Sequence, residues 1–147
     1  MSGGRYQVKL AVCLILRDGD AVLVAQRKNT GWKDGWFSLV AGHVEAGETA
    51  EQAMVREAKE EAGIDVAIDS LRHVYTMHRT GDGEYVDVFF ECHEWSGEPR
   101  NAEPHKCAEL RWEDIGQLPA ETLPGIRTVL AKYPLGRTYS SLRQQAD

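Results

Sequence analysis

The sequence is poor in cysteine, and the spacing of the few present excludes cysteine-based sites. Cys13, Cys92 and Cys107 are the three cysteines of a 147-residue chain, and they lie far apart. Neither the C-x-x-C pairs of a zinc site nor the cysteine density of a disulfide scaffold is found. We therefore expect three reduced thiols.

Long apolar runs and an excess of positive charge are also missing. No stretch approaches the roughly 18 apolar residues that a bilayer span needs, and the opening MSGGRYQVKL has no apolar signal-peptide core. These absences predict a cytoplasmic protein with no membrane role. The net charge of −6 disfavours the basic surface that binds DNA or long RNA. A polyanionic ligand would need metal ions to offset the acidic protein.

The composition is that of one ordinary globular domain. Hydrophobic residues make up 42% of the chain and charged residues 27%, close to the values for soluble domains. A chain of this length can bury a single core of its own. We predict one domain over residues 1–147, with a flexible tail at 135–147. The oligomeric state stays open, and a homodimer is one of the alternatives.

Hydrophobic patterning predicts two helices among several short strands. Residues 6–16 and 21–27 are β-rich runs, and the Asp18-Gly19 pair between them is a hairpin turn signal. Thr49 and Gln52 have capping-box spacing at the start of a helix, and Gly63 is suited to end it. A second amphipathic helix is expected to begin near Pro124. Further strands are predicted at 36–40, 65–68, 71–79, 84–95 and 108–115, with a turn at 80–83.

The first of these helices concentrates negative charge on one side. At about 100° per residue, Glu57, Glu60 and Glu61 fall in one arc, and the adjoining arc is apolar. Like charges at i and i+4, such as Glu57 and Glu61, cost about 0.3 kcal/mol unless a cation lies between them. Hard divalent cations such as Mg²⁺ select carboxylate oxygens. The cluster is therefore either a cation site or an ordinary solvated helix surface.

The segment GHVEAGETAEQAMVREAKEEAGI at 42–64 contains these acids and resembles the signature of the Nudix hydrolases. That signature is G-x5-E-x7-R-E-U-x-E-E-x-G-U, where U is aliphatic, and Ala58 is smaller than the usual residue at its U position. The resemblance implies an α+β fold, the Nudix-type α/β/α sandwich with a mixed central β-sheet. The fixed positions are matched by Gly42, Glu48, Arg56, Glu57, Glu60, Glu61 and Gly63.

The resemblance also implies a metal site in this 42–64 box. Mg²⁺, with Mn²⁺ as a substitute, would be bound by Glu57, Glu60 and Glu61. Because glycine permits a tight bend, a backbone carbonyl near Gly42 could join the coordination sphere. An additional carboxylate is expected in or beside the loop before the last strand. The spacing does not choose between Glu103 and Glu109, and we assign Glu109 to the metal.

Catalytic roles follow from the same resemblance. Glu48 and Arg56 would orient the metal-binding carboxylates, and we group them with Glu60 and Glu61 as catalytic. The general base stays open among Glu60, Glu61, Glu109 and Glu103.

The implied reaction is attack of water on a diphosphate linkage in a small nucleotide. NAEPHKCAELRW at 101–112 resembles a region of MutT-like enzymes that act on nucleoside triphosphates. We therefore expect a nucleoside monophosphate and pyrophosphate as products, as in nucleotide-pool sanitation. The alternatives are ADP-ribose, a nucleotide sugar or another nucleoside diphosphate-X as substrate, RNA-end processing, and a non-catalytic nucleotide-sensing domain. The candidates for substrate binding are Arg27, Tyr75, His78 and Glu103.

Overall fold

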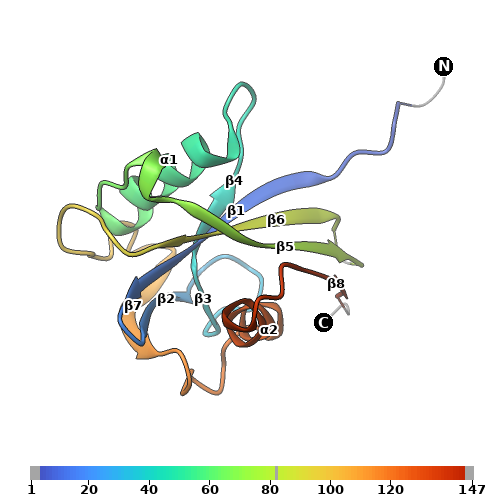
Figure 1. The fold of residues 1–147 in the computed structure, drawn as a ribbon. Helices are drawn as coiled ribbons and strands as arrows, with labels where there is room; N and C mark the ends of the chain where they lie inside the picture. The colour runs from blue at the N-terminus through green and yellow to red at the C-terminus, as the bar shows by residue number, and fades with distance from the viewer. Residues whose placement is uncertain (1–3, 82, 145–147) are drawn as a thin grey trace.

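A computed structural model describes residues 4–81 and 83–144, which form an eight-stranded sheet and two α-helices (Figure 1). The main strand order is β3-β2-β1-β6-β5-β8, while β4 pairs with β1 and β7 pairs with β2. The strands are β1 (Lys9–Asp18), β2 (Ala21–Arg27), β3 (Phe37–Ser38), β4 (Val40–His43), β5 (Arg72–Thr80), β6 (Tyr85–Cys92), β7 (Cys107–Asp114) and β8 (Tyr139–Arg143). The helices are α1 (Ala50–Ala62) and α2 (Pro124–Lys132), with short 3₁₀ turns η1 (Ile68–Ser70) and η2 (Tyr133–Leu135).

The sheet is mixed, as predicted. β1 runs parallel to β6 and β5 runs parallel to β8, whereas β1–β2, β1–β4 and β5–β6 are antiparallel pairs. The predicted hairpin is present, since Asp18 pairs with Ala21 across the turn. β4 is hydrogen-bonded to the middle of β1, from Ala11 to Leu14. This pairing places the start of the 42–64 box beside the centre of the sheet.

The helices cover opposite faces of the sheet, which confirms the predicted α/β/α sandwich. Successive residues of a strand point to opposite faces. Val12 and Leu14 of β1 accordingly pack in one buried cluster with Met54 of α1, whereas Cys13 and Ile15 pack in a second cluster with α2. Figure 1 shows α1 and α2 on opposite sides of the central strands. Within the described residues, no helix is long and apolar enough to cross a membrane.

Three sequence expectations need correction. The strand predicted at 36–40 is split into β3 and β4, which pair with different neighbours. The strand predicted at 65–68 is a single bridge between Asp65 and Ser96 followed by η1. Residues 139–143, expected in a flexible tail, form β8 against β5 because this edge of the sheet was open for pairing. The rest of that tail at 145–147, and Asp82 in the predicted turn, lie outside the described residues.

Candidate metal and phosphate site

Helix α1 presents the carboxylates at fixed positions because both of its ends are capped. The Thr49 side chain accepts a hydrogen bond from the Gln52 backbone N–H, and the Gln52 side chain accepts one from Thr49 N–H. At the other end Gly63 adopts a left-handed conformation with φ of 68°, which favours glycine. Buried Ala53, Met54, Ala58 and Ala62 hold the apolar side of the helix against the sheet. The acidic side of the helix therefore lies at the border of its buried contact with the sheet.

Glu57 reaches its position because residue 42 has no side chain. A Cβ atom added to Gly42 would lie 2.2 Å from both Cδ and Oε1 of Glu57. No real pair of such atoms approaches this closely, so only glycine allows the carboxylate to rest against the backbone of β4. The side chain of Glu57 is consequently only 12% exposed.

Glu61 is buried beside Glu57 with little to offset its charge. Its Oε1 accepts a hydrogen bond of 3.3 Å from the backbone N–H of Ala41. Burial, followed by the hydrogen bond and charge of Glu57, raises the pKa of Glu61 from its usual 4.5 to about 9. Without a cation, Glu61 therefore retains its proton at neutral pH.

This pair fits the divalent cation that the sequence implies. Two carboxylates in contact, on a helix capped at both ends, supply the oxygen donors that Mg²⁺ prefers. Across the described residues, no three acidic, histidine or cysteine side chains already converge as a cation-binding group. Arg56 contributes to this arrangement, because its Nη1 donates to Glu57 at 2.8 Å and to Glu60 at 3.2 Å. Glu57 and Glu61 are therefore the residues that would hold the ion, with half-exposed Glu60 beside them.

Arg56 connects the loop of the 42–64 box to the helix. Its Nε and Nη2 donate to the two carboxylate oxygens of Glu48 at 2.8 and 3.0 Å, and Nη2 also donates to the carbonyl of His43 at 3.0 Å. The hydrogen bond from Arg56 holds the pKa of Glu48 at about 2. Together with its bonds to Glu57 and Glu60, Arg56 fixes residues 43–48 against the acidic face of α1.

Replacement of Arg56 by lysine is expected to lower the hydrolytic activity that the 42–64 box implies about tenfold, because residues that orient ligands typically contribute 10–100-fold. Lysine keeps the charge but cannot reach Glu48, Glu57 and the His43 carbonyl at once. Steady-state kinetics would measure the loss. Arg127→Lys is the matched control, since Arg127 donates to the Pro119 carbonyl and does not line this site. Equal activity in both variants would contradict the role assigned to Arg56.

A cavity of about 320 Å³ opens over these carboxylates. It lies between α1, the ends of β2 and β4, and the loop before β7. Arg27 enters it from β2 and is held in place by hydrogen bonds from Nε to the Trp32 carbonyl, 2.8 Å, and from Nη2 to Thr30 Oγ1, 2.9 Å. Its charged lining residues are Glu57, Glu60, Glu61, Glu103, Arg27 and Lys106.

The cavity brings together some of the predicted residues and separates others. Arg27 and Glu103 line it, and the charge of Glu103 contributes to the raised pKa of Glu61. Glu109 does not line it: its neighbour Leu110 does, and adjacent strand residues point to opposite faces. Glu109 instead pairs with Arg111 at 3.2 Å, so its assignment as a metal ligand is not supported by its position.

Tyr75 and His78 also lie apart from the cavity. Tyr75 has no exposed surface and packs edge-to-face on Phe89, with ring centroids 6.1 Å apart. It is a core residue, and its position does not support the prediction that it binds substrate. His78 pairs within the sheet with Val86 and Ser141 and does not line the cavity. Sequence reasoning missed Lys106, although the EPHKC segment that contains it was recognised.

Comparisons with known proteins agree with this geometry. The family model described as NUDIX domain matches residues 7–133. An ADP-ribose pyrophosphatase of Methanocaldococcus jannaschii is 37% identical over 111 residues, 75% of this chain and 64% of that protein. The NAD-capped RNA hydrolase NudC of Escherichia coli K12 is 33% identical over 123 residues, 82% of this chain and 46% of that protein. The chain thus spans about half to two thirds of the length of these curated relatives.

Among solved structures, a MutT NUDIX hydrolase from Burkholderia pseudomallei superposes with a TM-score of 0.80 at 25% identity. The match covers 86% of this chain and 98% of that one. The similarity therefore extends well beyond the 42–64 box.

Proposed function

Because the chain belongs to the NUDIX domain family, we propose that it hydrolyses a diphosphate linkage in a small nucleotide with the help of Mg²⁺. The observation that carries the proposal is the contact of Glu57 and Glu61 at the base of a cavity that Arg27 also lines. Carboxylates alone would repel a polyphosphate, whereas a guanidinium facing the same space attracts one. Mn²⁺ is a plausible substitute for Mg²⁺, since both take oxygen ligands.

The residues of the chain have separate tasks in this reaction. Arg27 binds a phosphate oxygen, and the bonds of Arg56 to Glu48 and Glu57 keep the box in shape. The bound divalent cation would screen phosphate charge and acidify the attacking water. The water oxygen forms a bond to phosphorus, the anhydride P–O bond breaks, and the proton from water passes to a carboxylate. The candidates for that base are now Glu60, Glu61 and Glu103, because Glu109 lies outside the cavity.

We assign a nucleoside triphosphate as substrate, with the monophosphate and pyrophosphate as products. Support comes from the MutT-like EPHKC loop, which places Glu103 and Lys106 in the cavity, and from the similarity to a MutT NUDIX hydrolase. ADP-ribose is a second candidate, favoured by the 37% identity to an ADP-ribose pyrophosphatase. It would give AMP and ribose 5-phosphate by the same bond cleavage.

A nucleotide panel assayed by product identity tests both candidates. Purified protein with Mg²⁺ is incubated with nucleoside triphosphates, ADP-ribose, a nucleotide sugar and NAD, and the products are separated by ion-exchange chromatography. Release of monophosphate and pyrophosphate from a triphosphate at the highest kcat/KM is the expected result. Preferential release of AMP from ADP-ribose would shift the assignment to the second candidate. No cleavage of any member of the panel would refute hydrolysis altogether.

A further inference from the structure

Two segments that are distant in the sequence form one wall of the cavity. Residues 28–29, which follow β2, are tied to residues 104–106, which precede β7. The Lys28 N–H donates to the Lys106 carbonyl at 3.0 Å, and the Asn29 side chain donates to the His105 carbonyl at 3.2 Å. The Lys28 ammonium also donates to the Pro104 carbonyl at 3.4 Å. Arg27 and Lys106 are therefore held next to each other by a shared set of hydrogen bonds.

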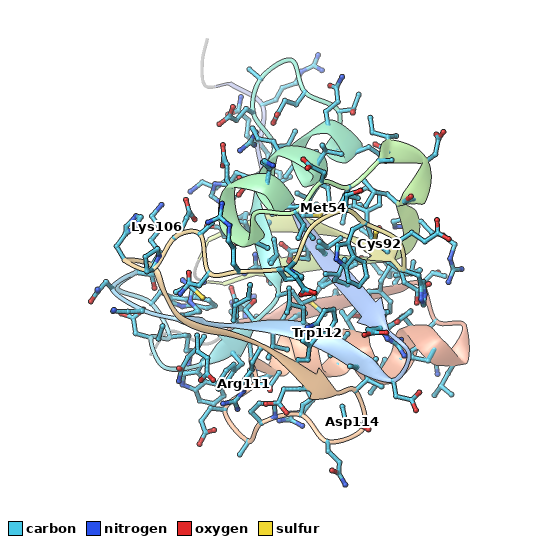
Figure 2. The ribbon with its side chains drawn as sticks, turned by 90° about the vertical axis from the view of Figure 1, so that its left-hand side faces the viewer. Met54, Cys92, Lys106, Arg111, Trp112 and Asp114 are labelled. Atoms are coloured by element: carbon cyan, nitrogen blue, oxygen red, sulfur yellow. The ribbon has the colours of Figure 1, made fainter. Side chains whose placement is uncertain are left out.

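The loop before β7 is also attached to α1. The N–H groups of Arg100 and Ala102 donate to the Ala62 and Glu61 carbonyls at 2.9 and 3.1 Å. Within the loop, the Lys106 and Cys107 N–H groups both donate to the Glu103 carbonyl. Glu103 and Lys106 thus lie in one tight turn, and both line the cavity. Figure 2 shows Lys106 just before the start of β7.

The side chains of Lys106 and Arg27 differ in the partners that they have among the described residues. In residues 4–81 and 83–144, the Lys106 ammonium forms no ion pair and no hydrogen bond, whereas the Arg27 guanidinium is bonded to Trp32 and Thr30. Lys106 is thus an exposed cation on a fixed turn, and its cavity is also lined by four carboxylates. It is available to bind an anionic ligand. Lys106 lines the same cavity as Glu57 and Glu61, so a further phosphate of a substrate bound there is within reach of this wall.

We propose that Lys106, beside Arg27, binds the additional phosphate of a nucleoside triphosphate and so favours triphosphates over nucleoside diphosphate sugars. This inference rests on the proposed function and specifies its substrate class. A triphosphate carries one more ionised phosphate than ADP-ribose, whose second group ends in a neutral sugar. A charge-assisted hydrogen bond from the Lys106 ammonium to that phosphate would strengthen the binding of a triphosphate. ADP-ribose has no such phosphate and would gain nothing from it.

Replacement of Lys106 by methionine tests the inference through the ratio of two substrates. The variant is expected to raise KM for a nucleoside triphosphate about tenfold, with a much smaller change in kcat, because one charge-assisted hydrogen bond is lost. KM for ADP-ribose is expected to stay close to that of the wild type. Lys106→Arg, which keeps the charge, is expected to recover most of the affinity.

Lys132→Met is the matched control, because it removes the same charge from the last turn of α2, which does not line the cavity. Equal effects of Lys132→Met and Lys106→Met, or equal effects of Lys106→Met on both substrates, would overturn the inference. Calorimetric titration with an α,β-methylene nucleoside triphosphate and Mg²⁺ separates binding from turnover. Tenfold weaker binding by Lys106→Met would sustain the inference even if no substrate were hydrolysed. Unchanged binding would refute it independently of the proposed function.

Discussion

Replacement of Glu61 by glutamine is expected to reduce hydrolysis about 10²–10⁴-fold, the range found for catalytic acid–base groups. The amide keeps the shape of the side chain and can still accept from Ala41 N–H. It cannot carry the negative charge that either a cation ligand or a general base needs. Steady-state rates on the best substrate of the panel measure the loss, with Glu51→Gln, in the first turn of the same helix, as the control.

The same variant is expected to be more stable than the wild type when no cation is present. The folded protein holds the pKa of Glu61 at about 9, above its usual 4.5, so the unfolded chain releases this proton first as the pH rises. Wild-type stability therefore falls between about pH 4.5 and about pH 9, while the glutamine variant is spared this loss. A gain of about 1–2 kcal/mol near pH 8 is expected, as for other substitutions that relieve strain at functional sites.

Thermal unfolding in chelator at pH 5 and pH 8 measures this difference. The gap between variant and wild type should widen at the higher pH. Added Mg²⁺ should raise the Tm of the wild type more than that of the variant, because a ligand that binds only the folded state stabilises it. A variant that loses stability as pH rises, or gains as much from Mg²⁺ as the wild type, would contradict the placement of Glu61 at a cation site.

Replacement of Gly42 by alanine is expected to reduce activity about 10²-fold, because displacing a reacting group by about 1 Å can cost that much. The new Cβ would lie 2.2 Å from the carboxylate of Glu57. That carboxylate is the end of a flexible side chain, so it can move away while the fold remains intact. The expected signature is a large loss of kcat/KM with a small change in Tm, measured on the same preparation.

Gly125→Ala is the control for this substitution. Its Cβ would meet Leu142 and Met77 at 3.3 and 3.4 Å, in the first turn of α2 and away from the cavity. Activity should be retained there. Full activity in Gly42→Ala would show that the close approach of Glu57 to β4 is not needed for catalysis.

Local sequence signals predicted the part of the site that lies on one helix. Thr49, Gln52 and Gly63 are near in sequence to the groups they cap, so their spacing was sufficient to place both ends of α1. The same helical geometry placed Glu57, Glu60 and Glu61 on one side. Residues three and four apart on a helix are neighbours whatever the rest of the chain does.

The sequence could not decide where residues from distant segments would lie relative to one another. Glu103 and Glu109 are equally plausible by spacing, and only the orientation of β7 beside β2 put one inside the cavity and the other outside. Tyr75 has the aromatic character of a base-binding residue, but the register of β5 with β6 turned it into the core. β8 could not be foreseen from its five residues, since its pairing depends on the exposed edge of β5.

The sequence by itself thus determined the helix, its caps and the arc of acids, because each depends on contacts within about four residues. The tertiary structure alone decided which cations face those acids. Arg27 and Lys106 are 79 positions apart, and both line the cavity because hydrogen bonds join residues 28–29 to residues 105–106. Such pairing depends on strand register, which is fixed by the whole sheet and its buried faces and which no short segment encodes.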